Sequence, residues 1–193
     1  TETAYRTDSI MLISVDPAAN TASMLSIPRD LWVEMPDGFD PNTINTANFI
    51  GDAYQLPGGG PEFAMKTIRH NLGVSVDYYV RLDFTAFEKI IDTIGGIEID
   101  NPTDIDDPEY PDGSYGYEPF YLSAGVHTLN GHDALRYART RHDDSDINRA
   151  QRQQQVVLAV RDKVLSLGTL PSLLAQAPTL FSTLKESIQT NLT

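Results

Sequence analysis

The chain has 193 residues, 40% of them hydrophobic, with 14 basic and 27 acidic side chains and a formal net charge of −13. This length and apolar content suit one folded domain with a real core, or at most a small pair of domains, and exclude a disordered acidic segment. The acidic balance excludes a nucleic-acid binder that relies on a general basic surface. Because the chain has no cysteine, disulfides, thiol nucleophiles and cysteine-ligated metals are excluded as well.

The first predicted element is a β-hairpin. Residues 9–15 form an almost continuous apolar run that is typical of a buried strand. Turn-forming residues at 16–20 lead into a second predicted strand over 22–27. Further along, Pro61 follows a glycine-rich stretch and predicts the first turn of a helix that ends at Gly73.

The middle of the chain alternates strand and helix patterns. A strand is predicted over 77–82, and the apolar spacing of 84–94 predicts a helix that stops at Gly95. A short strand over 97–99 then leads into 100–122, which is rich in Asp, Pro and Tyr and predicts a long loop. This alternation indicates a mixed fold of strands and helices.

Two capped helices and a tail complete the predicted elements. Asn130 can cap a short helix and Asp146 a long one, because both side chains accept hydrogen bonds from a first helical turn. Residues 169–193 are predicted to form a helical tail interrupted by prolines. The whole pattern predicts an α/β fold of three layers (α/β/α), with a central sheet flanked by helices. The early hairpin makes that sheet mixed rather than purely parallel.

The first candidate site lies at the open end of the hairpin. If the turn is centred between residues 18 and 19, paired residue numbers sum to 37, and Asp8 lies opposite Arg29. Arg6 and Asp30 flank the same position. Such a group can bind a ligand, but spacing alone favours an ordinary ion pair of little energetic value.

A second candidate follows the short helix. An extended segment would point Arg139 and Arg141 to the same face. Two neighbouring guanidinium groups repel each other unless a negative group lies between them. Asp143, Asp144 and Asp146 follow at once and can supply it. A solvated charge cluster explains the same pattern.

The third candidate is the start of the long helix. Arg149 and Arg152 fall in its first turns, where each cation opposes the helix dipole at a cost of about 0.3–1 kcal/mol. Such a placement makes sense if a strong anion binds there, because a helix N-terminus is already an anion site. The same face continues with Gln153 and then with Val156, Val160 and Val164. A ligand with a charged head and an apolar tail would match it, and an ordinary amphipathic helix fits equally well.

Seven blocks occur in a fixed order along the chain. They read RTDSIML (6–12), SIPRD (26–30), INTA (44–47), VDYYV (76–80), IDTIGGI (91–97), LNGHDALRYARTR (129–141) and DINRAQRQQ (146–154). This ordered set resembles the LytR-CpsA-Psr (LCP) domain, and the match runs from about Arg6 to Leu167. The resemblance implies that residues 1–168 form an LCP domain and that 169–193 pack on it or extend it.

The resemblance implies an enzyme that moves a glycopolymer from a polyprenyl-pyrophosphate carrier to peptidoglycan, on the outer face of the bacterial cytoplasmic membrane. It implies a pyrophosphate clamp of Arg6, Arg29, Arg139, Arg141, Arg149 and Arg152, with Gln153 beside it. Asp8, Arg29, Asp30, Arg139 and Arg141 would act in catalysis, with Asp8 or Asp30 taking the hydroxyl proton. Asp8 would also hold Mg²⁺. The prenyl tail would enter an apolar tunnel along Val156, Val160 and Val164.

The resemblance also implies that parts of the full protein lie outside this sequence. We expect the first strand of the domain, a second metal-binding carboxylate and a membrane anchor to precede Thr1, so that this piece is soluble and its own activity is an open question. No run approaches the roughly 18 apolar residues of a membrane-spanning helix. Two alternatives to transfer remain: hydrolysis of polyprenyl pyrophosphates, and a non-enzymatic module that binds polyprenyl phosphate. No nucleic-acid partner is expected.

Overall fold

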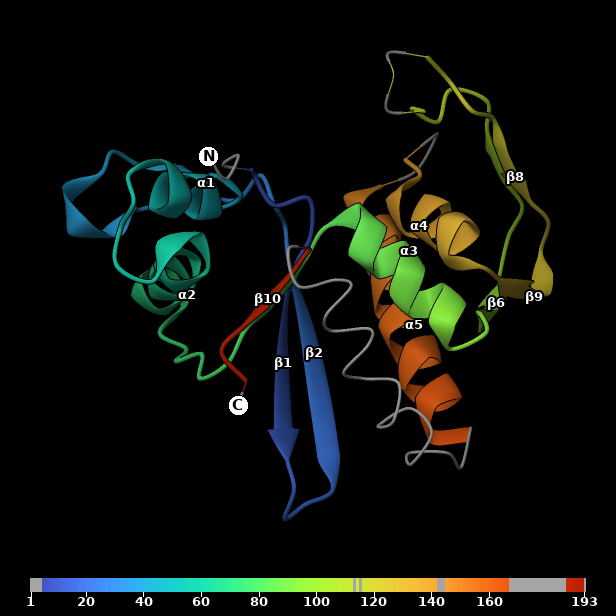
Figure 1. Ribbon diagram of the computed structural model, residues 1–193, viewed down its shortest axis with the longest axis horizontal. Helices are drawn as coiled ribbons and strands as arrows, with labels where there is room; N and C mark the ends of the chain where they lie inside the picture. Colours follow the sequence, from blue (N-terminus) through green and yellow to red (C-terminus); the bar gives the residue numbers. More distant parts are fainter. Residues whose placement is uncertain (1–4, 113, 115, 142–144, 167–186, 193) are drawn as a thin grey trace. The chain divides into compact units, whose positions relative to one another are not determined.

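The structure is a computed structural model that describes residues 5–112, 114, 116–141, 145–166 and 187–192. The chain divides into two compact units: unit 1 contains Thr1–Arg81 and Thr190–Thr193, and unit 2 contains Leu82–Gln189. Figure 1 shows the helices and strands of both units. Each unit has a hydrophobic core of its own. The predicted domain boundary at residue 168 lies outside the described residues.

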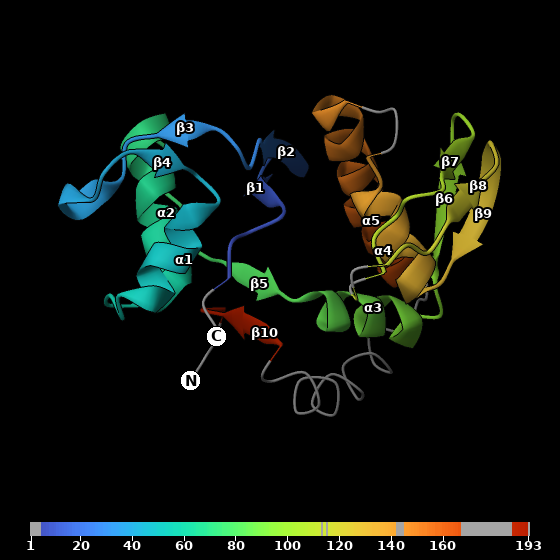
Figure 2. The same ribbon diagram turned by 90° about the horizontal axis from the view of Figure 1, so that it is seen from above.

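Unit 1 combines short strands with two helices. Its elements are β1 (Ile10–Asp16), β2 (Thr21–Ile27), β3 (Trp32–Val33), the 3-10 helix η1 (Pro36–Gly38), β4 (Asn42–Thr43), α1 (Thr46–Ala53) and α2 (Gly59–Leu72). β5 (Val80–Leu82) pairs with β10 (Ile188–Thr190), and the two units divide within these strands. β3 and β4 pair beside the two helices (Figure 2).

β1 and β2 form the predicted hairpin with the predicted register. The strands are antiparallel, and Asp16 lies opposite Thr21, so paired residue numbers sum to 37. The Asp16 carboxylate closes the turn, because its Oδ1 accepts the backbone N–H groups of Ala18 and Ala19 at 2.9 and 3.0 Å. The turn therefore fixes the register of the hairpin. That register also decides which residues lie opposite each other just beyond the open end of the two strands.

Close packing of α1 on α2 forms much of the core of unit 1. A Cβ atom on Gly51 would lie only 2.6 Å from Gly60 Cα, so glycine is needed where the helix backbones meet. α2 ends at Leu72 and is capped by Gly73, the residue predicted to end it. The φ of Gly73 is 69°, which suits glycine. The buried residues of this core are Ile27, Val33, Met35, Ile44, Ala47, Ile50, Phe63 and Ile68.

Unit 2 packs three helices on one side of its strands (Figures 1 and 2). Its elements are α3 (Phe84–Thr93), β6 (Ile97–Asn101), β7 (Ile105–Asp107), β8 (Phe120–Leu122), β9 (Gly125–Leu129), α4 (Gly131–Arg139) and α5 (Asp146–Ser166). β6 pairs with β9 and β7 with β8, both antiparallel. The alternating burial of β6 points Ile97, Ile99 and Asn101 inward, which places the core between this strand and the helices.

The helix starts of unit 2 differ in how well they were predicted. Asn130 caps α4 as predicted, because its Oδ1 accepts the Asp133 N–H at 2.8 Å. α5 begins at Asp146, but the capping acceptor is Ser145 Oγ, 3.2 Å from the N–H of Asn148. The predicted cap at Asp146 is therefore wrong by one residue, which leaves the Asp146 carboxylate available for other contacts.

The strands of unit 2 and the chain end correct two predictions. The predicted loop over 100–122 contains β7 and β8, whose three-residue lengths are too short to give a readable alternation. Most of the predicted helical tail (169–186) lies outside the described residues, but Ile188–Thr190 is a strand rather than a helix. Hydrogen bonding to β5 provides the backbone partners that a helix would otherwise supply.

The predicted α/β class is confirmed. In the described part of the chain the strands pair two by two, and each pair with an assigned register is antiparallel. Several strands have only two or three residues, so they offer few backbone groups to a second neighbour. Over the same residues, no helix is both long and apolar enough to cross a membrane.

Candidate functional site

Unit 1 brings three predicted site residues together at the open end of the hairpin. Arg29 Nη1 donates to Asp8 Oδ1 at 2.7 Å, which is the contact that the register predicted. Arg29 Nε lies 3.5 Å from Asp30 Oδ2, an ion-pair distance that is not a hydrogen bond. The Arg29 side chain is only 26% exposed, whereas Arg6 is exposed. The hairpin thus presents one partly buried guanidinium between two carboxylates.

The start of α1 positions this group. The Asn45 N–H donates to the Arg29 carbonyl at 3.1 Å, and the Asn45 carbonyl accepts the Thr7 N–H at 3.2 Å. Asn48, which is 3% exposed, donates from Nδ2 to the Tyr5 carbonyl at 2.9 Å. One turn of chain therefore holds both segments that carry Asp8 and Arg29. Asn45 belongs to the INTA block (44–47), for which the sequence predicted no role.

In unit 2, the first turn of α5 and the preceding Arg141 bring two arginines to one carboxylate. Arg141 Nη2 lies 2.8 Å from Asp146 Oδ1, and Arg149 Nη2 lies 3.2 Å from the same oxygen. Asp146 thus lies between Arg141 and Arg149, whereas the predicted pair of neighbouring arginines was Arg139 and Arg141. The other two candidates for the negative group, Asp143 and Asp144, lie outside the described residues. A single carboxylate oxygen shared by two guanidinium groups is the arrangement that a phosphate oxygen would also accept.

Arg139, the last residue of α4, is held by aromatic rings. Its guanidinium carbon lies 4.1 Å from the Phe84 ring centroid and 5.8 Å from that of Tyr110. Nη1 donates to the Tyr110 hydroxyl at 3.2 Å. Burial raises the pKa of the Tyr110 phenol, and the Arg139 charge partly offsets that effect. Among the described residues no carboxylate lies within 4.0 Å of this half-buried cation, so Arg139 is suited to an external anion.

Arg152 and Gln153 contact the end of α4 instead of a solvent-facing site. Arg152 is 8% exposed and donates from Nε to the Tyr137 carbonyl at 3.0 Å and from Nη2 to the Thr140 carbonyl at 2.6 Å. Gln153 Nε2 donates to the Ala138 carbonyl at 3.3 Å. The last carbonyls of a helix lack partners within it, so these side chains cap α4 from α5. Their place in a pyrophosphate clamp stays a prediction.

Comparison with known proteins decides the family. The sequence model of the LytR_cpsA_psr family matches residues 1–193. The chain belongs to the LytR-CpsA-Psr family. It is 37% identical to the polyisoprenyl-teichoic acid–peptidoglycan teichoic acid transferase TagT of Bacillus subtilis, over 86% of this chain and 48% of that protein. It is 35% identical to the regulatory protein MsrR of Staphylococcus aureus, over 97% of this chain and 51% of that protein.

Solved structures of LCP proteins have the same fold. The crystal structure of B. subtilis TagV superposes with a TM-score of 0.74 at 31% identity, over 98% of this chain and 67% of that one. A structure of TagT bound to LIIa-WTA gives a TM-score of 0.73 at 34% identity, over 97% of this chain and 65% of that one. The family assignment from the ordered motifs is thereby confirmed. The chain spans about half the length of the curated relatives it matches.

The valines predicted to line the LCP lipid tunnel belong to the core of unit 2. Val156 is 2% exposed and packs in that core, while Val160 and Val164 are partly buried against it. A prenyl chain would reach Val156 only by displacing core side chains. Val160 and Val164 are the more accessible of the predicted lipid contacts.

The LCP-type metal prediction rests on Asp8 alone. Asp8 Oδ1 already accepts a hydrogen bond from Arg29. Within the described ranges, no group of three or more His, Asp or Glu side chains lies close enough to hold a metal ion. Mg²⁺ is usually held by one or two carboxylates together with water and substrate phosphates, so Asp8 as a Mg²⁺ ligand stays a prediction.

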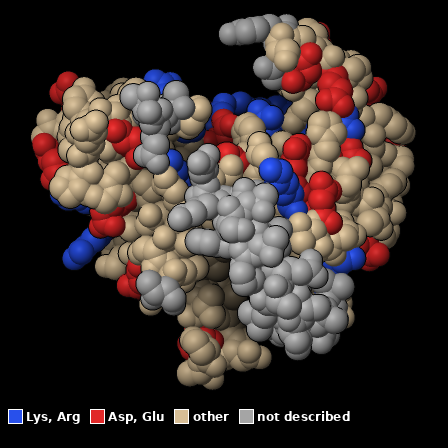
Figure 3. Space-filling model, in the orientation of Figure 1, with Lys and Arg blue, Asp and Glu red and all other residues tan. Residues whose placement is uncertain are grey.

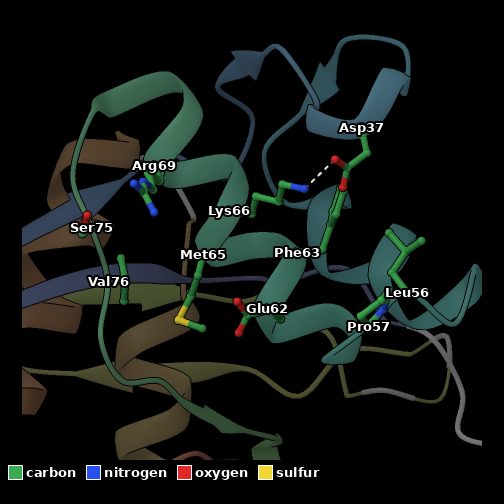
Figure 4. Close-up of a pocket in the computed structure, with 10 residues that line it drawn as sticks. All are labelled: Asp37, Leu56, Pro57, Glu62, Phe63, Met65, Lys66, Arg69, Ser75 and Val76. Atoms are coloured by element: carbon green, nitrogen blue, oxygen red, sulfur yellow. Dashed lines mark hydrogen bonds and ion pairs between the residues drawn. The ribbon is translucent and has the colours of Figure 1, made fainter.

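A hollow of about 460 Å³ in unit 1 is lined by none of the predicted site residues (Figure 4). Four charged side chains line it: Glu62, Lys66 and Arg69 from α2, together with Asp37. Their formal charges cancel, and Lys66 Nζ lies 2.5 Å from Asp37 Oδ1. The hollow thus lacks the excess positive charge that a pyrophosphate requires.

On the face drawn in Figure 3, acidic side chains lie on the surfaces of both units with basic ones among them.

Proposed function

We propose that the protein containing this chain transfers a glycopolymer from a polyprenyl-pyrophosphate carrier to peptidoglycan, at the outer face of the bacterial cytoplasmic membrane. One observation supports this most directly: Arg139 is a half-buried cation without a carboxylate partner in the described residues. In the same unit, Arg141 and Arg149 share one oxygen of Asp146. The relatives TagT and TagV carry transferase names that specify polyisoprenyl-linked teichoic acid and peptidoglycan. The substrates and the membrane location belong to the proposal.

The proposed reaction is a phosphoryl transfer. A hydroxyl of the acceptor sugar attacks the phosphorus next to the glycan sugar, the bond to the bridging oxygen breaks, and polyprenyl phosphate leaves. Arg139, Arg141 and Arg149 would neutralise the charge that grows on the leaving phosphate, because guanidinium forks match phosphate oxygens. Asp8 or Asp30 would accept the hydroxyl proton, and of the two Asp30 is held less tightly by Arg29.

The magnesium ion remains a prediction of the family resemblance. When bound, it would neutralise pyrophosphate charge, with Asp8 as its ligand from this chain. The proposed roles of the arginines and of Asp30 do not require the ion, and the described residues hold no group of three or more His, Asp or Glu side chains that could bind it alone.

The test is transfer of a labelled lipid-linked glycan to isolated peptidoglycan by the full-length protein. Arg139→Ala and Arg149→Ala should each abolish transfer. Arg161→Ala is the matched control, because Arg161 lies on the same helix as Arg149, is 56% exposed and pairs with the adjacent Asp162. Full activity in both site variants would contradict the proposal.

The acceptor separates transfer from the two alternatives. Phosphate release that needs no peptidoglycan, with no glycan ever transferred, would indicate a hydrolase and overturn the proposal. Tight binding of polyprenyl phosphate without any chemistry would indicate a regulatory module, the role suggested by the name of the relative MsrR. Transfer that depends on peptidoglycan and is lost in both arginine variants would support the proposal.

A further inference from the structure

Arg139 differs from the other half-buried arginines in the side chains that contact its guanidinium group. Arg29, Arg81 and Arg136 each have a carboxylate within ion-pair distance: Asp8, Asp52 and Glu118 respectively. Arg139 instead has two aromatic rings and one phenolic hydroxyl. Taking a guanidinium partly out of water without an acid to pair with it is costly unless other contacts replace the water.

Phe84 is the first residue of α3 and its ring faces the guanidinium. The Asp83 side chain caps this helix by accepting the Ala86 N–H at 2.7 Å, which fixes the backbone that carries Phe84. The ring is 42% exposed, so the core does not require it for packing alone. Its distance of 4.1 Å to the Arg139 guanidinium carbon is well within the roughly 6 Å range of a cation–π contact.

Tyr110 supports Arg139 from the second side. It is 4% exposed, and its backbone carbonyl accepts the Glu118 N–H at 2.8 Å, so the ring is fixed within the core. Its hydroxyl receives one of the five N–H donors of Arg139. Stacking on rings satisfies the faces of the guanidinium without consuming the donors at its edge. The other donors of Arg139 make no hydrogen bond within the described chain.

We propose that Phe84 and Tyr110 are positioning residues that hold Arg139 flat and leave its edge donors for phosphate oxygens of the ligand. This inference rests on the proposed function, because it assigns the ligand of Arg139 as a pyrophosphate. An acidic partner would hold the side chain equally well, but it would neutralise the charge and occupy the same donors. Aromatic support orders the cation while keeping its charge available.

The test is a double-mutant cycle on ligand affinity, measured by titration calorimetry of the full chain with geranyl pyrophosphate. Phe84→Leu should weaken binding about fivefold, the effect of losing one partly exposed cation–π contact. Tyr110→Phe should weaken it by a similar or smaller factor, and Phe84→Trp should retain it. In an Arg139→Ala background, Phe84→Leu should change the affinity by less than about twofold, because its effect passes through Arg139.

Controls separate positioning from folding and from direct contact. Phe49→Leu removes a ring that is 40% exposed in unit 1, and it should leave binding unchanged. Circular dichroism should show that every variant folds. If Phe84→Leu weakens binding equally in the Arg139→Ala background, Phe84 acts on the ligand directly and the positioning role is wrong. The positioning role also fails if Arg139→Ala weakens binding but Phe84→Leu and Tyr110→Phe do not. If Arg139→Ala and Arg149→Ala both leave binding intact, the proposed function fails first, and the positioning role with it.

Discussion

Replacing Arg152 with methionine should destabilise unit 2 strongly. Arg152 is 8% exposed and donates to two main-chain carbonyls at the end of α4, those of Tyr137 and Thr140, which are 0% and 2% exposed. Hydrogen bonds from a charged donor contribute about 1.5–3 kcal/mol each, and their loss leaves buried acceptors unsatisfied. Methionine recovers part of this through apolar packing, so we expect a net loss of about 3 kcal/mol in the free energy of unfolding.

Arg141→Met is the matched control for this prediction. Arg141 is 46% exposed, and its partner Asp146 is 53% exposed. Such a surface pair contributes about 0–1 kcal/mol, so this variant should unfold close to the wild type. The same substitution at two arginines eleven residues apart therefore tests whether burial decides the effect.

Urea titration would measure the free energy of unfolding, and hydrogen–deuterium exchange would locate the change. Faster exchange in Arg152→Met should concentrate in the amides of α4 and of the first turns of α5, since Arg152 joins these elements. An effect no larger than that of Arg141→Met would refute the capping argument. So would unchanged exchange in α4 together with weaker pyrophosphate binding, which would place Arg152 in the clamp instead.

Three further predictions concern α4 and its surroundings. Hydrogen bonds to Glu118 and Glu88 raise the pKa of His132 above its ordinary value of about 6.5. Protonated His132 therefore stabilises the fold at lower pH, and this contribution is lost as the pH rises through the raised pKa. Thermal melts from about pH 5.5 to 8.5 should show this decline, and His132→Gln should flatten it; an unchanged slope would exclude His132 as the source. Gly131→Ala should cost about 1–3 kcal/mol in urea titration, because its Cβ would overlap the Glu88 carbonyl, and a neutral result would mean that α3 and α4 can separate. Asn130→Ala should cost about 1 kcal/mol through loss of the α4 cap, and Asn130→Asp should restore most of it.

The sequence predicted the elements whose signals are local. The hairpin register followed from the turn at 16–20, and the α4 cap followed from Asn130. α1 was not predicted, because it has only eight residues and no side-chain cap at its start. β3 and β4 have two residues each, which is too few for an alternating pattern. Short elements such as these are fixed by packing rather than by their own residues.

The residues of the candidate site likewise divide into those predicted from the sequence and those placed only by tertiary packing. The sequence by itself determined the family, through motifs in a fixed order, and the pairing of Asp8 with Arg29, through the symmetry of a hairpin. Only the tertiary structure placed Arg139 against Phe84 and directed Arg152 to the end of α4. Neither contact leaves a periodic trace in the sequence, because each joins residues from different helices. Similar arginines thus take different roles, according to which element packs against each of them.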